Sequence, residues 1–397
     1  MKQRQRKEIY LDAAATTAVT ANVRRAMDPW LGLAHDAEPA WGNPSALHAR
    51  GQKARVAVER ARRSIAQALQ VNPAHLTFTS GATEANNLIL QGRFFAVLAQ
   101  RGLEAAESFH LITSESEHSS VRKPAEFLRL LGAEVTYLRP NNQGVIATEQ
   151  LAAALEKGAG KTQFISLMLV NNETGVISPW KAFADLASQY EVPLHMDAVQ
   201  ALKSLDMGPI TTHPGVTALS FSAHKVGGPQ GAGLLWNREP MLVRPLTHGG
   251  GQERDLRSGT EAVGLIIGAA QAYVDAIQGI TEHRAISLEN NQALLQAFEN
   301  NNLDFVLHAK EAERIPSILN VEFPGLDAQS LLITLDMAGI AASTGSACSA
   351  GGSEESAVLK AMGLSTSSIT STVRFSFDGL IAADDFNHVA ETIKNAL

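Results

Sequence analysis

The sequence predicts an α/β fold with a large, mostly parallel sheet, and three observations favour it. Short apolar runs with strand character alternate with segments whose apolar residues recur at helical spacing. This alternation is typical of a parallel sheet that helices cover on both faces. From about residue 280 the pattern changes to a long helical stretch and then short strands, which indicates a second, smaller α+β domain. The length of 397 residues agrees, because single cores rarely grow beyond about 250–300 residues.

The expected elements follow in chain order. A strand at 9–11 precedes a helix at 56–69, and the strands expected for the large sheet lie at 76–79, 111–113, 164–170, 193–196 and 218–221. A helix is expected at 149–155. Beyond residue 280 we expect a strand at 317–323, a helix from Asp327, a strand at 373–377 and a last helix at 387–396. The predicted domains are therefore 18–280 for the large one, and 1–17 with 281–397 for the small one that carries Cys348 and Arg374.

Composition excludes several classes of protein. With 33 basic and 40 acidic residues the net charge is −7, which argues against a nucleic-acid partner. The longest uncharged runs are broken by serine, threonine and glycine, so no membrane span is expected. The basic residues 2–7 lead into Glu8 with no apolar signal core behind them, which favours the cytoplasm. One cysteine excludes an internal disulfide and a metal site of several thiolates, and no histidine and carboxylate set predicts another metal site.

Lys225 lies in a neutral run, 220–229, between small hydroxyl residues, a histidine and glycines. A lysine nucleophile must lose its proton near neutral pH, which burial and a nearby cation promote. Ser222 and His224 can donate hydrogen bonds to a phosphate. The run therefore predicts an anchor for pyridoxal 5'-phosphate (PLP), against the simpler interpretation of a surface lysine in a glycine-rich loop.

A second motif follows the strand expected at 76–79. Gly81, Ala82 and Thr83 open a helix there, and the free backbone amides at the positive end of that helix favour an anion, with the Thr83 hydroxyl as a further donor. Glycine and a capping threonine begin many helices. Combined with Ser222 and His224, however, the motif predicts a phosphate site.

Two further strands are followed by side chains that suit the ring of PLP. Asp197 would pair with a pyridinium nitrogen and keep it protonated, unless it only caps the next helix. Gln200 is three residues further on and would reach the phenolic oxygen of the ring. His118 would stack on the ring and move substrate protons, unless it is an exposed loop histidine. His195 is interpreted as structural.

Three residues are candidates for handling the substrate. Arg374 alternates with apolar neighbours on its strand, so its guanidinium points away from the face that they bury and suits a carboxylate. Asn172 would help to hold the same group. Cys348 is the only thiol, and it lies in the small-residue stretch 343–353, which suits a nucleophile that visits a buried cofactor.

These motifs resemble the PLP-dependent cysteine desulfurases of the NifS/IscS-like group, in the class V aminotransferase family. The resemblance runs from residues 11–17 to 373–376. It includes residues 42–45, 80–84, 117–118, 170–175, 197–200, 222–225, 248–253, 257–260 and 345–348.

The resemblance implies PLP fold type I and a role for each site residue. Lys225 carries PLP as a Schiff base and then takes the Cα proton of L-cysteine. Cys348 attacks the substrate sulfur and holds it as a persulfide while alanine leaves. Thr260 reaches the phosphate in the neighbouring subunit, so a homodimer is implied. The remaining roles are those given above, namely phosphate binding by Thr83, Ser222 and His224, ring contacts by Asp197, Gln200 and His118, and substrate binding by Arg374 and Asn172.

The sulfur would pass to an acceptor protein, such as an iron–sulfur scaffold, or serve transfer-RNA thiolation or another cofactor. The chain stops soon after its last expected helix. Members of the resembled group that serve iron–sulfur assembly commonly carry a longer tail at this point. The resemblance therefore does not imply a scaffold partner. The small-residue type of the cysteine segment favours direct transfer to several acceptors.

Three other functions compete with this one. A selenocysteine lyase, or another PLP-dependent lyase or aminotransferase of the same fold, would depend less on Cys348. An inactive PLP-bearing adaptor would retain the cofactor without turnover. A nicotinamide dehydrogenase is disfavoured because no Gly-x-Gly-x-x-Gly motif follows a strand.

Overall fold

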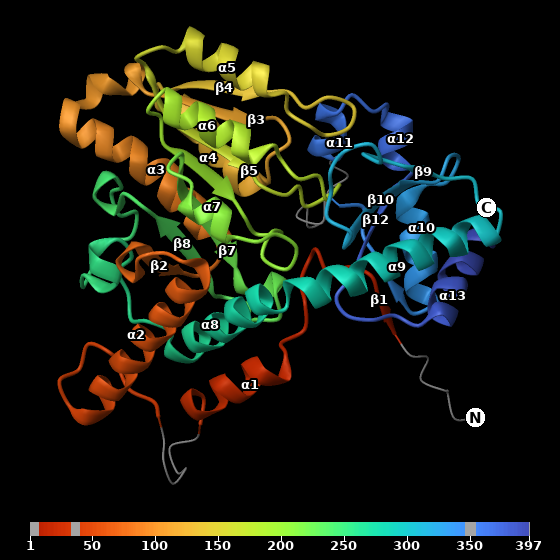
Figure 1. Ribbon diagram of the computed structural model, residues 1–397, viewed down its shortest axis with the longest axis horizontal. Helices are drawn as coiled ribbons and strands as arrows, with labels where there is room; N and C mark the ends of the chain where they lie inside the picture. The colour runs from red at the N-terminus through yellow and green to blue at the C-terminus, as the bar shows by residue number, and fades with distance from the viewer. Residues whose placement is uncertain (1–7, 33–39, 346–354, 397) are drawn as a thin grey trace.

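The computed structural model describes residues 8–32, 40–345 and 355–396, and its largest element is a seven-stranded sheet. The strand order is β2-β8-β7-β6-β5-β3-β4 (Figure 1). The bounds are Leu76–Thr79 (β2), His110–Ser114 (β3), Glu134–Leu138 (β4), Thr162–Met168 (β5), Leu194–Asp197 (β6), Val216–Ser222 (β7) and Gly233–Asn237 (β8). Only β8 is antiparallel to its neighbours in this sheet. The predicted α/β class with a mostly parallel sheet is therefore confirmed.

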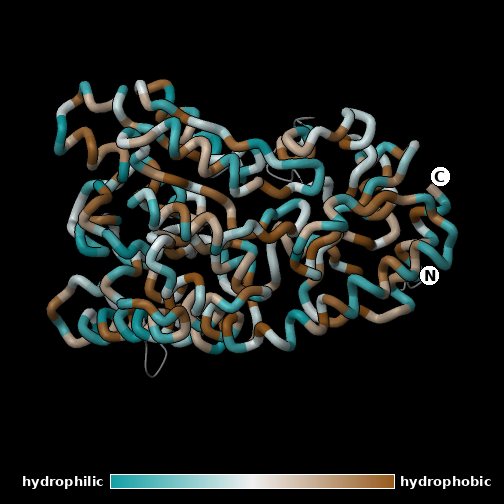
Figure 2. The backbone as a smooth tube through the Cα atoms, turned by 45° about the horizontal axis from the view of Figure 1, so that its top comes forward, coloured by the Kyte–Doolittle hydropathy of each residue, from teal (hydrophilic) through white to brown (hydrophobic). Residues whose placement is uncertain are grey.

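Helices cover both faces of this sheet because successive strand residues point to opposite sides. In β5, for example, Phe164 packs with one set of buried side chains and Ile165 with another. One face meets α3 (Ala82–Arg101) and α4 (Ser119–Leu130). The other meets α2 (Ala49–Leu69), α5 (Thr148–Lys157), α6 (Trp180–Gln189), α7 (Gly208–Thr212) and α8 (Val263–Gln278). Figure 2 shows the apolar segments running through the interior between these helices.

A smaller group of elements follows α9 (Ile280–Asn300) and lies to the right in Figure 1. Its antiparallel sheet has the order β12-β10-β9, formed by Thr372–Ser376, Ile318–Glu322 and Val306–Leu307. The associated helices are α10 (Ala328–Met337), α11 (Ala357–Ala361), α12 (Thr366–Thr370) and α13 (Ala383–Lys394). One set of buried side chains joins Ile9 and Leu11 to residues between Leu294 and Ile393. We propose, on this support, that 1–17 and 281–397 form a domain distinct from 18–280.

The segment at 9–20 connects this smaller group to the large sheet. Its strand β1 (Ile9–Tyr10) pairs in parallel with β11 (Ile340–Ala341), and Asp12 bridges to Ser376 in β12. Further along, the Thr17 amide donates to the His224 carbonyl at 2.8 Å. A short helix, α1 (Ala21–Met27), then packs against α8. The segment therefore reaches the turn that carries Lys225.

Most expected elements are present, with differences at their ends. The strand expected to reach Val170 stops at Met168, and Asp197 is the last residue of β6 and does not follow it. The helix expected from residue 56 begins earlier, at Ala49, and the last helix begins at Ala383 and ends at Lys394, earlier at both ends than expected. Strands β4, β8, β9 and β11 were not predicted; β4 is a partly exposed edge strand, and β9 and β11 have two residues each.

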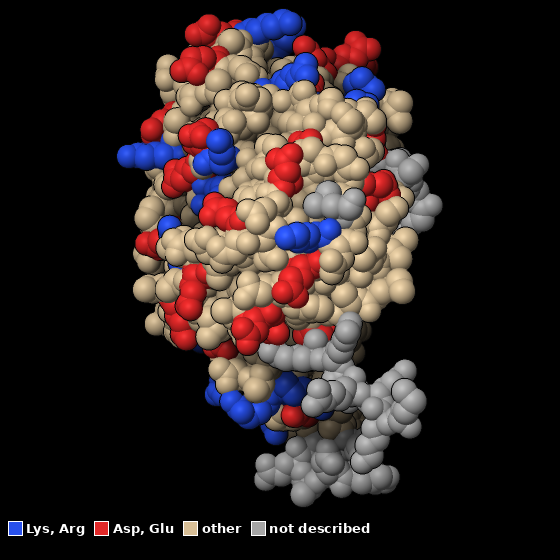
Figure 3. All heavy atoms as spheres, turned by 90° about the vertical axis from the view of Figure 1, so that its right-hand side faces the viewer, with Lys and Arg blue, Asp and Glu red and all other residues tan. Residues whose placement is uncertain are grey.

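Two surface properties complete the description. Among the described residues, no single helix is long and apolar enough to cross a membrane; only α8 and α9 taken together, with a 73° bend between them, have the required length and composition. On the face formed by the smaller group, Lys and Arg are interspersed with Asp and Glu (Figure 3).

Candidate active site

A pocket of about 580 Å³ opens at the carboxyl ends of the central strands of the large sheet. Ligands bind at this edge in open α/β sheets. The residues from the sequence analysis that line it are Gly81, Ala82, Thr83, His118, Asn172, Asp197, Gln200, Ser222, His224, Lys225 and Arg374. Thr260 does not line this pocket, and its side chain is exposed to solvent in the single chain. Cys348 lies outside the described residues.

One end of the pocket is formed by the start of α3. Gly81 is the N-cap and has no side-chain capping bond, so the first amides of this 20-residue helix face outward. A Cβ atom on Gly81 would lie 3.9 Å from Ser222 Oγ, so the hydroxyl adjoins the amides. The backbone of β8 approaches closely, since a Cβ on Gly233 would lie 2.4 Å from the Gly81 Cα. Residue 233 must therefore be glycine for this end of the pocket to keep its shape.

Lys225 and His224 lie on the turn that follows β7. Lys225 Nζ donates to the carbonyls of Ala14 at 2.6 Å and Ala15 at 2.7 Å, and Gln200 Nε2 donates to the Ala14 carbonyl at 3.0 Å. Burial, with a smaller effect of the Lys225 charge, lowers the pKa of His224 to about 4. His224 is therefore a neutral imidazole near pH 7, with its Nδ1 3.1 Å from Thr16 Oγ1.

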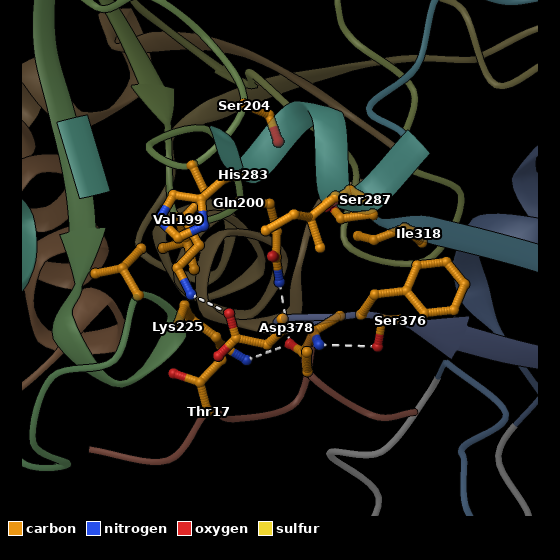
Figure 4. Close-up of a pocket in the computed structure, with 18 residues that line it drawn as sticks. Thr17, Val199, Gln200, Ser204, Lys225, His283, Ser287, Ile318, Ser376 and Asp378 are labelled. Carbon is orange, nitrogen blue, oxygen red and sulfur yellow. Dashed lines mark hydrogen bonds and ion pairs between the residues drawn. The ribbon is translucent and has the colours of Figure 1, made fainter. Parts of the chain in front are cut away.

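A second, smaller pocket of about 30 Å³ lies against the same backbone segment. Figure 4 shows Gln200 and Lys225 converging on this segment, with Ser376 beyond it. Both pockets are lined by Ala14, Val199, Gln200 and Lys225. The backbone at Ala14 therefore lies between the two pockets.

Asp197 and His118 line the large pocket from neighbouring elements. Asp197 is 4% exposed, and its carboxylate accepts from the Val199 amide at 3.1 Å and from Asn86 Nδ2 at 2.8 Å. His118 is the N-cap of α4, and its Nδ1 accepts from the Ser120 amide at 3.1 Å. No helix begins directly after Asp197, so it is not a helix cap, and His118 is half-buried and not an exposed loop residue.

Arg374 does point away from the apolar face of β12, but it is buried and not solvated. It is 2% exposed and forms an ion pair with Asp12, at 2.8 Å between Nη2 and Oδ1. Its Nη1 donates to the Asn172 carbonyl at 2.9 Å. Among the described residues, Arg374 Nε and Asn172 Oδ1 are buried without a hydrogen-bond partner. Unpaired buried groups of this kind are costly unless a ligand or water pairs with them, so they favour a polar ligand here.

Comparisons with known proteins agree with this geometry. Residues 9–388 match the family model described as aminotransferase class-V. The chain belongs to the class-V aminotransferases. Within that family it is 35% identical over 392 residues to the cysteine desulfurase IscS of Dictyoglomus turgidum, covering 99% of this chain and 95% of that protein.

Two solved structures resemble this class-V chain over almost its whole length. A NifS-like protein aligns with a TM-score of 0.87 and 29% identity, covering 98% of this chain and 99% of the other. SspA in complex with cysteine aligns with a TM-score of 0.78 and 32% identity, covering 95% and 100%. The resemblance stated from the motifs is therefore confirmed.

Class-V aminotransferases depend on PLP, and the pocket of this chain fits that cofactor. A phosphate needs several hydrogen-bond donors, which the amides of α3, Ser222 and the neutral His224 provide. A pyridinium needs a buried acceptor, which the Asp197 carboxylate provides. A lysine for covalent attachment lines the same pocket. The pocket therefore contains chemically suitable groups for the phosphate, the pyridine nitrogen and the covalent attachment of the cofactor.

Four residues of the site were not found from the sequence. Asp12 pairs with Arg374, Asn86 donates to Asp197, and Ser120 contacts His118. Glu173 is buried and accepts a hydrogen bond from Ser356. Asp12 lies inside the stretch 11–17 noted for the resemblance, and Asn86 lies just after the motif at 81–83, but their partners are 362 and 111 positions away. The sequence around each residue does not indicate such distant partners.

Glu117 is a fifth such residue, and it gives a testable pH dependence. It is fully buried, and burial raises its pKa to about 8. The hydrogen bonds from Ser114 and the Met168 amide lower this pKa, and the negative charge of Asp197 raises it further. The folded protein therefore keeps a proton on Glu117 that the unfolded chain loses above about pH 4.5. The stability contributed by this group is complete below about pH 4.5 and is lost as the pH rises to about 8.

We therefore expect Glu117→Gln, which mimics the protonated acid, to flatten this dependence. Between about pH 6 and pH 8 the free energy of unfolding of the wild type should fall by up to about 2 kcal/mol relative to the variant. Urea unfolding at both pH values measures the difference. Glu115→Gln, at an exposed carboxylate nearby, is the control. Parallel curves for wild type and Glu117→Gln would show that Glu117 is ionised in the folded protein.

Proposed function

We propose that this protein is a cysteine desulfurase that converts L-cysteine to L-alanine and transfers the sulfur to an acceptor. The observation that carries the proposal is the single pocket that unites Lys225, Asp197 and the start of α3 with the buried Arg374. Its relatives named cysteine desulfurase, at 31–37% identity over nearly the full length, support the same activity.

Each wall of the pocket would hold one part of PLP. The α3 amides, Thr83, Ser222 and His224 would bind the phosphate. Asp197 would bind the pyridine nitrogen, Gln200 the phenolic oxygen, and His118 the ring face, with Lys225 as the point of attachment. PLP, when bound, supplies an electron sink for the charge that develops at the substrate Cα.

Lys225 Nζ would be the group that moves the proton. The Ala14 and Ala15 carbonyls hold its position when the ammonium is present. Once the substrate amine has displaced it, the free amine of Lys225 would take the Cα proton and return a proton to the carbon that becomes the methyl group of alanine. Because the pKa of the adjacent His224 is lowered to about 4, its imidazole is a weak base and does not compete with the Lys225 amine for that proton near neutral pH.

Arg374 and Asn172 would orient the substrate through its carboxylate. The Asp12 carboxylate holds one edge of the guanidinium, which leaves Nε to meet a ligand. Orientation matters because the substrate sulfur must be presented to Cys348. The Cys348 thiolate would then form an S–S bond to the substrate sulfur as the Cβ–S bond breaks, so a persulfide remains on the protein.

The wider setting is part of the proposal. Thr260 would serve the phosphate site of a second copy in a homodimer. The persulfide would pass to a sulfur-acceptor protein, for iron–sulfur cluster assembly or another sulfur-containing product. A cytoplasmic location agrees with a single thiol that has to stay reduced between turnovers.

Alanine and sulfide release from L-cysteine, in the presence of a reductant, tests the activity. We expect equal amounts of alanine and sulfide, with the purified protein carrying PLP. Selenide release from selenocysteine with no turnover of cysteine would favour the lyase. PLP retention without either turnover would favour the inactive adaptor.

Arg374→Ala is expected to raise the KM for L-cysteine by about 10- to 100-fold, because a charged hydrogen bond to the carboxylate contributes about 1.5–3 kcal/mol. Arg374→Lys keeps the charge without the planar fork and should give an intermediate KM. Melting temperatures identify any loss of folding, since the side chain is buried. An unchanged KM in folded Arg374→Ala would remove Arg374 from the substrate site.

A further inference from the structure

Four side chains form a continuous hydrogen-bonded path beneath the large pocket. Asn86 Nδ2 donates to Asp197 Oδ2 at 2.8 Å and to Ser120 Oγ at 2.9 Å. Ser120 Oγ lies 2.7 Å from His118 Nδ1. The path joins β6, α3 and the start of α4, and Asn86 and Ser120 are 0% and 6% exposed.

The chemistry of these groups fixes the direction of every hydrogen bond in the path. A carboxylate only accepts, so the Asn86 amide must turn its NH₂ group, and not its oxygen, toward Asp197. The same NH₂ group then supplies the hydrogen to Ser120 Oγ. Because a lone pair of Ser120 Oγ accepts that hydrogen, the hydroxyl hydrogen of Ser120 is available for His118 Nδ1.

His118 Nδ1 must be an acceptor, because the Ser120 backbone amide, which can only donate, points at it at 3.1 Å as the capping bond of α4. The Ser120 hydroxyl, at 2.7 Å, is therefore a second donor to the same nitrogen. A neutral imidazole carries one proton, so with Nδ1 accepting, that proton lies on Nε2.

We propose that Asn86 and Ser120 are positioning residues that fix His118 as its Nε2–H tautomer and tie its orientation to Asp197. The assignment rests on the proposed function only in placing His118 beside PLP. The consequence is that the two groups facing the cofactor ring are held by one shared amide, so they cannot reorient independently.

Nitrogen NMR of the PLP-loaded protein with isotope-labelled histidine reads the tautomer directly, without turnover. The His118 signals are identified by their loss in His118→Gln. We expect the wild type to show an unprotonated Nδ1, and Ser120→Ala to shift that signal, because Nδ1 then accepts from the Ser120 backbone amide alone. Ser120→Thr, which restores the hydroxyl, should return the wild-type signal.

The matched control is Ser119→Ala, at the neighbouring hydroxyl on α4, which should leave the His118 signals unchanged. A protonated Nδ1 in the wild type, or an unchanged His118 signal in Ser120→Ala, would overturn the proposal. Because this readout needs no catalysis, its result is independent of whether the protein turns over L-cysteine.

Kinetics provide a second test of the coupling. We expect Ser120→Ala to lower kcat about tenfold with a KM within about twofold of wild type, and Ser120→Thr to recover it. Asn86→Ala should also lower PLP affinity, whereas Asn87→Ala, at the half-buried neighbour that does not contact Asp197 or Ser120, should not. The double variant Asn86→Ala/Ser120→Ala should lower kcat by less than the product of the two single-variant factors, because both substitutions interrupt the same path. A decrease in kcat equal to that product would show that the two residues do not act together.

Discussion

Lys225→Ala is expected to eliminate alanine and sulfide production from L-cysteine. The substitution removes both the point of covalent attachment and the base that takes the Cα proton, so no partial route remains. PLP should still bind through the α3 amides and Asp197, which the substitution leaves in place. Borohydride reduction followed by mass spectrometry should therefore add PLP to the wild type but not to the variant.

Lys225→Arg is the matched control for that experiment. Arginine keeps a cation beside the Ala14 and Ala15 carbonyls, which accept from Lys225 in the wild type. It cannot form the covalent link, so it should be as inactive as alanine. Turnover in either variant would contradict the assignment of Lys225 as the catalytic amine.

Cys348→Ser is expected to stop sulfide release while leaving PLP bound and covalently attached. The serine hydroxyl is a poor nucleophile toward sulfur, so the substrate Cβ–S bond should remain intact. Wild-type protein incubated with L-cysteine without reductant should gain the mass of one sulfur atom, and the variant should gain nothing. Because the chain has one cysteine, alkylation before the assay modifies that position alone and should reproduce the variant.

Equal sulfide release by wild type and Cys348→Ser would assign the reaction to a lyase that needs no thiol. Release from neither protein, with PLP attached in both, would indicate the inactive adaptor. Unchanged covalent attachment of PLP is the internal control, because Cys348 is proposed to act only on the substrate sulfur.

The sequence predicts which residues meet in the large pocket better than the contacts that hold them. Lys225, Asp197 and the start of α3 line that pocket because each lies at or just after the end of a strand, and the carboxyl ends of parallel strands share one edge of a sheet. The pairing of Asp12 with Arg374 was not found, because it depends on β1 and β12 being brought together by the smaller sheets. Alternation in a strand indicates which way Arg374 points but does not say what covers that side.

Asn86 illustrates the same limit inside a helix. Its position on α3 is consistent with the helical spacing, but its partners belong to β6 and α4. Glu117 is similar, since a carboxylate next to a histidine in a polar stretch is ordinarily an exposed residue. Its burial follows from the way the turn after β3 folds beneath Met168, which local sequence does not specify.

The pairing of Asp12 with Arg374 also has a consequence for how the protein is made. The two residues are 362 positions apart, so at about 5–20 residues per second the ribosome needs roughly 20–70 s to add the second after the first. During that interval the early segment has neither its strand partner at Ile340 nor its ion-pair partner. The large sheet can form on the nascent chain, but the wall that contains Asp12 and Ala14 has to wait for nearly complete translation. This wall of the pocket is therefore completed late in synthesis, and translation arrested before Arg374 would leave a chain with an open, incomplete binding site.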